Sequence, residues 1–230
     1  MTTSNLDISQ FDHTPFTGTC FLDPEENVYM LCKKLGMIGM ADAEGSDLFA
    51  VFISNEKKQV PLWHQKASKR ADGIILWDYH VICIQKKKEG SSPPQVWDLD
   101  SSLPFPSHLD HYMSDSFRPS FQLFPIIREP GFVMNRFFRI VHAPLFLHSF
   151  ASDRRHMKNS DGNWISPPPA QDPIVADDGS LYNLDEYIRM NAADAVTEVK
   201  DDTISAVFTQ KYGVLVRESQ LEEFFSLLSG

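Results

Sequence analysis

The sequence is poor in cysteine and in long apolar runs. It has only three cysteines in 230 residues, Cys20, Cys32 and Cys83. This odd number, together with a polar N-terminus that lacks the apolar segment of a signal peptide, argues against a disulfide framework and favours a reducing compartment. No run approaches the roughly 18 consecutive apolar residues that a membrane span requires. We therefore expect an intracellular protein that does not enter a membrane.

Basic residues and metal-binding patterns are also scarce. The chain carries 21 Lys and Arg against 31 Asp and Glu, a formal net charge of −10, and its one dense basic run is Lys86-Lys87-Lys88. Because phosphate binding needs clustered Lys and Arg, we expect no nucleic-acid partner. The sequence has neither Cys and His pairs at zinc spacing nor a Gly-rich phosphate loop, so we expect no metal and no cofactor.

What remains is the composition of an ordinary globular protein, with 42% hydrophobic and 23% charged residues. The segment 1–19 shows no hydrophobic periodicity and is predicted to be a flexible arm. No internal repeat and no linker-like stretch divides the rest of the chain. Residues 20–230 are therefore predicted to form a single domain.

Helix signals stand at both ends of this predicted domain. Asp23-Pro24-Glu25-Glu26 offers an N-cap, a proline at the first helical position and an acidic first turn. A buried helical stripe follows at positions i, i+3, i+4 and i+7, made by Val28, Leu31, Cys32 and Leu35. This helix is predicted to end near Gly36, and two more are predicted over Leu184–Met190 and Ser219–Leu228.

Runs rich in β-branched and aromatic residues predict a sheet. The segment Lys86–Pro94, with charges, glycine and paired prolines, separates two such runs and predicts a hairpin. Ser160–Asp178 predicts an extended surface loop. The predicted strands are Leu48–Ser54, Pro61–Trp63, Ile74–Gln85, Gln95–Leu99 and Phe138–Val141. The fold class is therefore α+β.

A histidine and an aspartate in the predicted hairpin are candidates for chemistry. Strand alternation puts Asp78, His80 and Ile82 on one face, and Trp77, Tyr79 and Val81 on the other. A hairpin that turns about Glu89 pairs residues whose numbers sum to about 178, which places His80 opposite Asp98. An Asp that accepts from one imidazole nitrogen leaves the other as a base. Asp100 is the reserve candidate, and a packed histidine beside a strand-end cap is the alternative interpretation.

A thiol near the start of a helix would supply a nucleophile. The positive end of the helix dipole favours the thiolate, and a neighbouring imidazolium completes the ion pair. Cys20 lies just ahead of the first predicted helix and is the candidate, with an exposed arm thiol as the alternative. Cys32 belongs to the apolar stripe and Cys83 to the strand face opposite His80, so both are predicted to be structural.

Five sequence blocks together resemble the protein N-terminal glutamine amidohydrolase family. They are Glu25–Tyr29, Val51–Glu56, Trp77–Val81, Asp98–Pro106 and Phe150–Trp164. They follow the family order from near His13 to the C-terminus. The resemblance implies a monomeric α-β-α fold of the papain and transglutaminase type, with a central, mainly antiparallel sheet. It also implies a Cys-His-Asp triad that converts an N-terminal Gln to Glu, after which the product is arginylated and the protein is degraded.

The family's catalytic residues carry over only in part. By position its His is His80 and its Asp is Asp98, but the family Cys directly precedes the Glu-Glu-Asn block, where this sequence has Pro24. Cys20 is the nearest thiol upstream. Either the segment folds back to deliver Cys20, or this chain is a catalytically impaired isoform that binds N-terminal Gln without turnover. A cysteine protease or transglutaminase with the same triad is a third alternative.

The resemblance also sets expectations for the substrate site and partners. Glu26, Asp78 and Asp153 are candidates to bind the free α-amine of the substrate, and backbone N–H groups at the helix start would hold the oxyanion. His156, beside Arg154, is predicted either to line the site or to brace a loop. The expected partners are proteins and peptides with an N-terminal Gln, and the expected location is the cytoplasm, with the nucleus as a second one.

Overall fold

The fold is built on one antiparallel sheet. The structure is a computed structural model and describes residues 24–71, 73–87, 92–117, 135–165, 167–169 and 171–228. Six strands pair in the spatial order β6 (Ser107–His108), β5 (Gln95–Trp97), β4 (His80–Gln85), β1 (Leu48–Ser54), β7 (Phe137–His142) and β8 (Val214–Arg217). A separate two-stranded sheet is formed by β2 (Val60–Leu62) and β3 (Ile75–Trp77).

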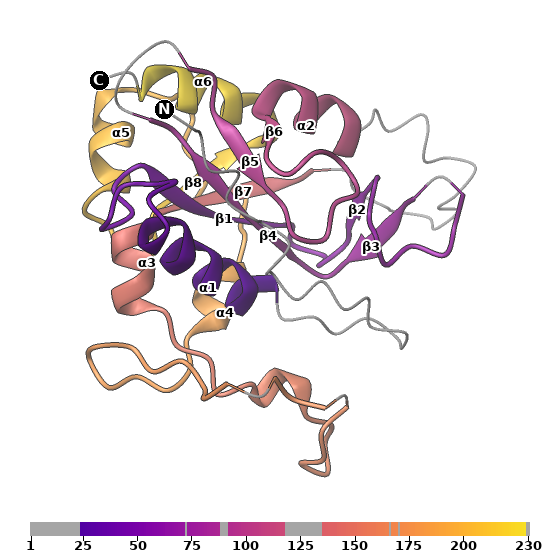
Figure 1. The fold of residues 1–230 in the computed structure, drawn as a ribbon. Coiled ribbons are helices and arrows are strands. Elements are labelled where there is room, and N and C mark those ends of the chain that lie inside the picture. The colour runs from indigo at the N-terminus through magenta and orange to yellow at the C-terminus, as the bar shows by residue number, and fades with distance from the viewer. Residues whose placement is uncertain are drawn as a thin grey trace, which may run out of the picture.

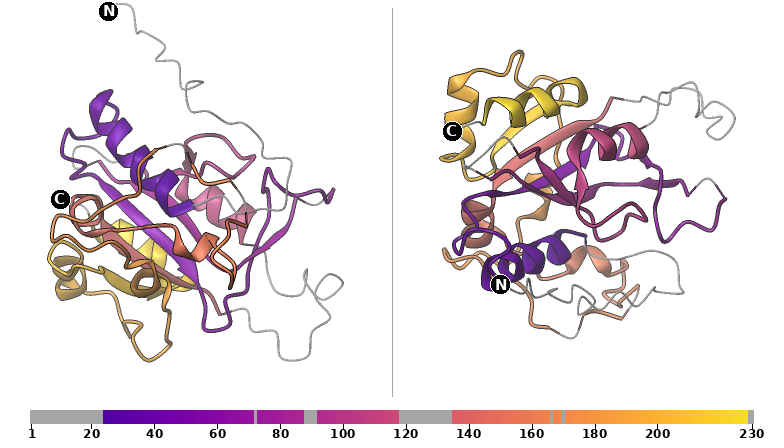
Figure 2. Two further views of the ribbon diagram at one scale, coloured as in Figure 1. Left: turned by 90° about the horizontal axis from the view of Figure 1, so that it is seen from below. Right: turned by 45° about the horizontal axis from the view of Figure 1, so that its top comes forward.

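Helices cover both faces of the six-stranded sheet (Figures 1 and 2). One face carries α1 (Pro24–Met37), α3 (Ala143–Ser149) and α4 (Leu184–Ile188), and the other carries α2 (Leu109–Ser116), α5 (Asp201–Val207) and α6 (Leu221–Leu227). Every residue of β1 is buried. Alternate residues of that strand enter two hydrophobic clusters, with Ala50 and Phe52 in one and Phe49 and Val51 in the other. The result is an α+β protein with a helix–sheet–helix layer order.

The first helix forms as its sequence predicts. Pro24 starts α1, two glutamates occupy its first turn, and Lys34 lies in its last turn. The four predicted stripe residues, Val28, Leu31, Cys32 and Leu35, are all buried against the sheet. The helix ends at Met37, one residue beyond the predicted Gly36, and Gly39 then turns the chain with a φ of 73°.

The predicted strand Ile74–Gln85 is wrong in its continuity. Asp78 and Tyr79 belong to neither strand and divide the predicted strand in two. As a result, β3 pairs with β2, whereas β4 pairs with β1 and β5. The break interrupts the strand alternation. The Trp77 ring, predicted to lie on the face opposite His80, instead packs 5.3 Å from the imidazole, centroid to centroid.

The other predicted strands lie within two residues of their predicted bounds at each end, as β1, β2, β5 and β7. The predicted C-terminal helices appear as α4 and as α6, the latter preceded by a short 3-10 turn, Glu218–Gln220. Elements absent from the prediction are short: α2, α3, α5, β8 and the two-residue β6. Such helices of seven or eight residues owe their stability to packing rather than to local propensity.

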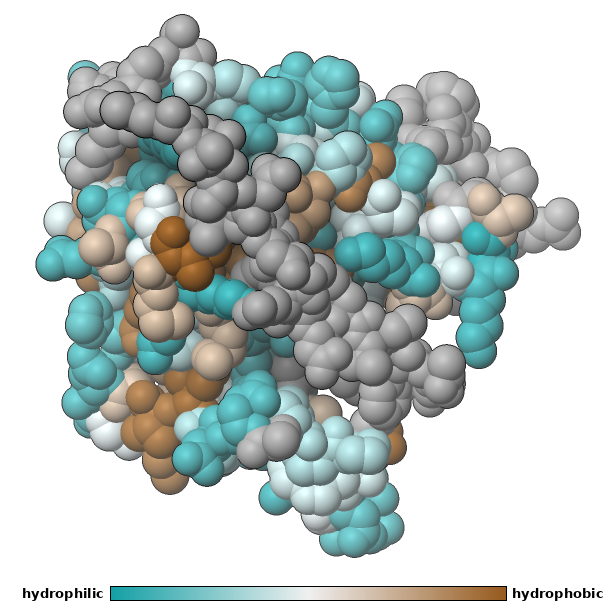
Figure 3. Space-filling model, in the orientation of Figure 1, coloured by the Kyte–Doolittle hydropathy of each residue, from teal (hydrophilic) through white to brown (hydrophobic). Residues whose placement is uncertain are grey.

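The predicted extended loop Ser160–Asp178 contains no helix in its described part and is tied down by two isolated bridges, Lys158↔Trp164 and Ser152↔Ile174. The predicted arm 1–19 lies outside the described residues, so the arm and the single domain stay predictions. On the face shown in Figure 3, apolar surface occurs in separate areas bordered by polar residues. Among the described helices, none is long and apolar enough to span a membrane.

Candidate active site

The site is centred on His80, the first residue of β4. This residue is fully buried and pairs with Ile53 at the end of the buried strand β1. Its Nε2 lies 3.1 Å from Oδ1 of Asp98, a residue that is 4% exposed. The structure therefore brings together the histidine and the aspartate that the sequence singles out.

The predicted hairpin register that led to this pair is wrong by two residues. β4 and β5 pair Gln85 with Gln95 and Cys83 with Trp97, so paired numbers sum to 85 + 95 = 180 rather than 178. Continued past Trp97, this ladder would align His80 with Asp100. The strand ends instead, and the Asp98 carboxylate folds back to accept the Asp100 backbone N–H at 2.9 Å. This turn directs Asp98 diagonally onto His80.

Hydrogen bonds and charge keep Asp98 ionised. The Tyr112 hydroxyl on α2 donates to Oδ2 of Asp98 at 2.7 Å. Burial by itself raises the pKa of Asp98, but the charge of His80 and the hydrogen bonds from His80, Tyr112 and the Asp100 N–H together lower it below its usual value. Burial and the Asp98 charge raise the pKa of Tyr112 well above its usual value, so the phenol remains a donor.

The imidazole of His80 has one oriented nitrogen and one open nitrogen. Burial lowers the pKa of His80, but the charge and hydrogen bond of Asp98 and the charge of Asp100 outweigh burial and raise it above its usual value. The other ring nitrogen, Nδ1, is buried and has no hydrogen-bond partner among the described residues. A base with a fixed tautomer and an unused nitrogen is the arrangement required for accepting a proton from a nucleophile.

Asp100 is a second carboxylate in the same site. Burial, followed by repulsion from Asp98, raises the pKa of Asp100 to about 6, although His80 and Lys66 oppose the shift. One possible ligand atom from each of His80, Asp98 and Asp100 lies within 4.8 Å of the others, the sole such group in the described ranges. Both carboxylate oxygens of Asp98 already accept hydrogen bonds. These bonds fix the Asp98 carboxylate, which in turn orients the imidazole of His80.

The described thiols lie away from this chemistry. Cys32 on α1 and Cys83 on β4 are both buried in the hydrophobic cluster between helix and sheet, with their sulfur atoms 3.7 Å apart. Burial raises the pKa of Cys83 well above its usual value, which disfavours the reactive thiolate. Their predicted structural role agrees with this packing. Cys20 lies outside the described residues, which begin with Pro24 at the start of α1.

The first turn of α1 carries a buried carboxylate that sequence reasoning did not single out. Glu25 is fully buried, and the Tyr79 hydroxyl donates to its Oε2 at 2.7 Å. His156 Nε2 lies 3.5 Å from its Oε1. Since Tyr79 precedes His80 directly, this contact ties the start of α1 to the start of β4. The sequence places Glu25 in the acidic first turn of the helix and in the Glu-Glu-Asn block, and neither signal predicts this contact.

The next carboxylate, Glu26, forms a buried ion pair with Arg154. Arg154 Nε lies 2.9 Å from Oε1 of Glu26, and its Nη2 lies 2.8 Å from Oε2. Both side chains are nearly inaccessible, at 4% and 1% exposure. The pair neutralises Glu26, so its charge is already balanced within the protein.

The other two α-amine candidates are more accessible. Asp78 is exposed at the break between β3 and β4, and its backbone carbonyl accepts a hydrogen bond from the Ser54 hydroxyl. Asp153 forms an exposed pair with Arg155, whose hydrogen bonds lower the Asp153 pKa. Of the two predicted roles for His156, the structure gives it a position beside Glu25.

Comparisons with known proteins agree over nearly the whole chain. The chain is 57% identical to the protein N-terminal glutamine amidohydrolase of Arabidopsis thaliana, over 97% of this chain and 95% of the relative. It is 51% identical to the protein of the same name from Oryza sativa subsp. indica, over 98% and 91% of the two chains. A Drosophila ananassae protein of that name is 41% identical over 73% of this chain and 76% of its own.

A sequence model of the family described as N-terminal glutamine amidase matches residues 19–225. This match spans the His80–Asp98 pair, the Glu25–Tyr79 contact and the Glu26–Arg154 ion pair, and it therefore includes every part of the site described above. The chain belongs to the N-terminal glutamine amidase family.

Proposed function

We propose that this chain is a protein N-terminal glutamine amidohydrolase, which hydrolyses the side-chain amide of an N-terminal Gln to give Glu and ammonia. The observation that carries this function is the 57% identity, over 97% of the chain, to a protein of that name. The buried His80–Asp98 pair supplies the base that such a hydrolysis needs.

In the proposed mechanism the first half-reaction forms a thioester. His80 takes the proton of the Cys20 thiol at its open nitrogen Nδ1, and the thiolate attacks the carboxamide carbon of the substrate. The imidazolium then returns the proton to the leaving nitrogen, and the C–N bond breaks to release ammonia. Backbone N–H groups at the start of α1 stabilise the oxyanion of the tetrahedral intermediate.

The second half-reaction uses the same base. His80 accepts a proton from water, and the resulting hydroxide attacks the thioester carbon. The C–S bond breaks, the thiol regains a proton from the imidazolium, and N-terminal Glu leaves. Asp98 remains ionised throughout, fixes the His80 tautomer and stabilises the imidazolium. Tyr112 holds the second Asp98 oxygen.

The proposed fold relationship is to the papain and transglutaminase type. Supporting it are the antiparallel sheet between two helical layers, and the packing of α1 on the strand that carries His80. We further propose that the protein acts as a monomer in the cytoplasm, and that Asp78 or Asp153, rather than the neutralised Glu26, contributes to binding the substrate α-amine.

A second candidate function rests on Pro24, which occupies the position of the family nucleophile. In that case the chain binds an N-terminal Gln but does not hydrolyse it. Catalytic geometry loses about a hundredfold in rate for a misplacement of about 1 Å, so a displaced thiol is a specific reason to consider a binding module.

One experiment separates the two candidates. A Gln-initiated peptide is incubated with the full chain and with Cys20→Ala, and ammonia release is measured together with conversion of Gln to Glu by mass spectrometry. The amidohydrolase releases ammonia and the Cys20→Ala variant does not. Calorimetric binding of the peptide without ammonia release identifies the binding module, and absence of both overturns the proposed function.

A further inference from the structure

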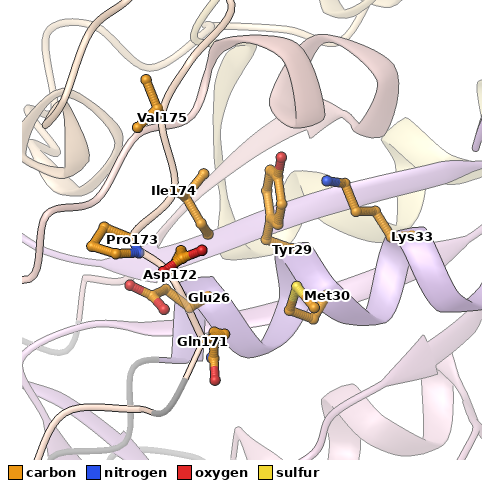
Figure 4. Close-up of a pocket in the computed structure, with 9 residues that line it drawn as sticks. All are labelled: Glu26, Tyr29, Met30, Lys33, Gln171, Asp172, Pro173, Ile174 and Val175. Carbon is orange, nitrogen blue, oxygen red and sulfur yellow. The ribbon is translucent and has the colours of Figure 1, made fainter.

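A pocket of about 310 Å³ runs along α1 from its first turn (Figure 4). One wall is the helix surface formed by Glu26, Tyr29, Met30 and Lys33, and the other is the segment 171–175. From Glu26 to Lys33 the helix rises about 10 Å at 1.5 Å per residue. That length matches about three residues of extended chain at roughly 3.3 Å each.

The pocket wall is fixed to α1 by Arg154. Besides its ion pair with Glu26, this guanidinium donates to the carbonyl oxygens of Pro169 at 3.3 Å, Gln171 at 2.9 Å and Asp172 at 3.4 Å. Arg154 also holds a left-handed backbone conformation, with φ at 60°, which is uncommon for a non-glycine residue. A buried ion pair is costly to break, so the pocket is already formed before a ligand arrives.

The lining has the chemistry of a peptide site. Met30 is 47% exposed and Val175 is 52% exposed, both high for large apolar side chains, and both border the pocket. Asp172 is an exposed carboxylate that makes no ion pair within the described part of the chain. The Lys33 ammonium lies 4.6 Å from the centre of the Tyr29 ring. An apolar centre with a polar group at each end fits a short peptide that carries an apolar side chain.

The position of the pocket identifies the occupant. Glu26, in the first turn of α1, also lines the pocket, so the pocket begins at the helix end where the proposed oxyanion is held. Because Arg154 neutralises Glu26, this carboxylate is not available to the substrate ammonium. We propose that it binds the residues that follow the N-terminal Gln of a substrate, as an extended segment with apolar side chains. This inference rests on the proposed function, which makes the substrate a polypeptide.

The test compares a short and a longer substrate. Ammonia release is measured from Gln-Gly-amide, which does not fill the pocket, and from Gln-Leu-Ala-Leu-amide, which does. The ratio of kcat/KM for the longer to the shorter peptide is expected to exceed one, and to fall about tenfold in Met30→Glu and in Val175→Glu, because each variant puts a charge against the apolar segment. Leu181→Glu, at a residue that is 56% exposed and outside the pocket, is the matched control and is expected to keep the wild-type ratio.

An unchanged ratio in both pocket variants, or an equal fall in Leu181→Glu, would overturn the proposal. If the wild-type chain releases no ammonia from either peptide, the proposed function fails, and calorimetry of the same two peptides tests the pocket separately. Binding of the longer peptide that is weakened about tenfold by the pocket variants then supports the pocket. Equal binding by wild type and variants, or no binding, rejects it.

Discussion

His80 Nε2 lies 3.1 Å from Asp98 Oδ1, although the β4–β5 register, if extended past Trp97, would align His80 with Asp100. The contact exists because β5 ends at Trp97 and the following turn redirects the Asp98 side chain. In this turn the Asp98 carboxylate also accepts hydrogen bonds from the Tyr112 hydroxyl and the Asp100 N–H. The orientation of the imidazole therefore depends on a small network as well as on the sheet.

The first prediction concerns the roles of this pair. His80→Ala removes the base and should abolish ammonia release, and Asp98→Asn should lower kcat by about 10⁴, as in the serine-protease precedent, because Asn favours the wrong tautomer. Circular dichroism and thermal melting check that both variants fold. Near-normal turnover in a folded variant would remove that residue from the mechanism.

The second prediction concerns stability at the Asp100 carboxylate. Its pKa is raised to about 6 in the folded protein, above the value of about 3.9 expected for an unfolded Asp. The folded state therefore prefers the protonated form, and stability is lost as the pH rises from about 4 to about 6. Asp100→Asn should increase the free energy of unfolding at pH 8, by on the order of 1–3 kcal/mol, and leave it nearly unchanged at pH 3.5.

Urea unfolding of wild type and Asp100→Asn at the two pH values measures this difference. Ser102→Ala, at an exposed residue of the same turn region, serves as a control that should show no such pH dependence. A gain of the same size at both pH values would show that the carboxyl titration is not the cause.

The third prediction compares adjacent arginines. Arg154→Ala leaves the buried Glu26 carboxylate unpaired and should lower the free energy of unfolding by about 3–5 kcal/mol. Arg155→Ala breaks only an exposed pair with Asp153, so its effect should be too small to resolve. Equal losses of unfolding free energy in the two variants, measured by urea unfolding, would contradict the importance of the buried Arg154–Glu26 ion pair for stability.

The fourth prediction repairs the departure from the family pattern. Replacing residues 17–24 with Tyr-Cys puts a thiol directly before Glu25, where the first turn of α1 favours the thiolate. This variant should release ammonia faster than the wild type. Iodoacetamide labelling against pH reports thiolate formation in both proteins. Equal turnover, with Cys20 labelled as readily as the new thiol, would show that the native segment already delivers its nucleophile.

The predictions of helices and strands that the structure confirms depend on sequence patterns of a few neighbouring residues. The α1 stripe is buried as predicted because helical periodicity depends on residues three and four apart. The strand β1 has its predicted bounds because its apolar run is rich in β-forming residues. The sequence predicts that His80 and Asp98 lie together, and they are in contact, but the predicted register is one that the structure corrects. The interruption of the strand after Trp77 and the turn after Trp97 depend on tertiary packing, which the alternation of side chains along a strand does not encode.

Long-range contacts could not be read from the sequence. Glu26 and Arg154 are separated by 128 positions, and only the folded chain reveals that each neutralises the other. The same holds for Tyr79 with Glu25, 54 positions apart. Sequence reasoning could assign these residues to family blocks, yet it left the role of His156 open because its neighbour lies on a distant helix.

The residues that hold the base His80 and the candidate nucleophile Cys20 lie in different parts of the chain. His80 and Asp98 are held by the sheet and by α2, all of which lie after Pro24. A change of sequence ahead of Pro24 therefore alters the thiol without removing any described contact of the imidazole. Exchanging the segment before Pro24 therefore changes the nucleophile and leaves the base alone, because every described partner of the His80–Asp98 pair stays in place.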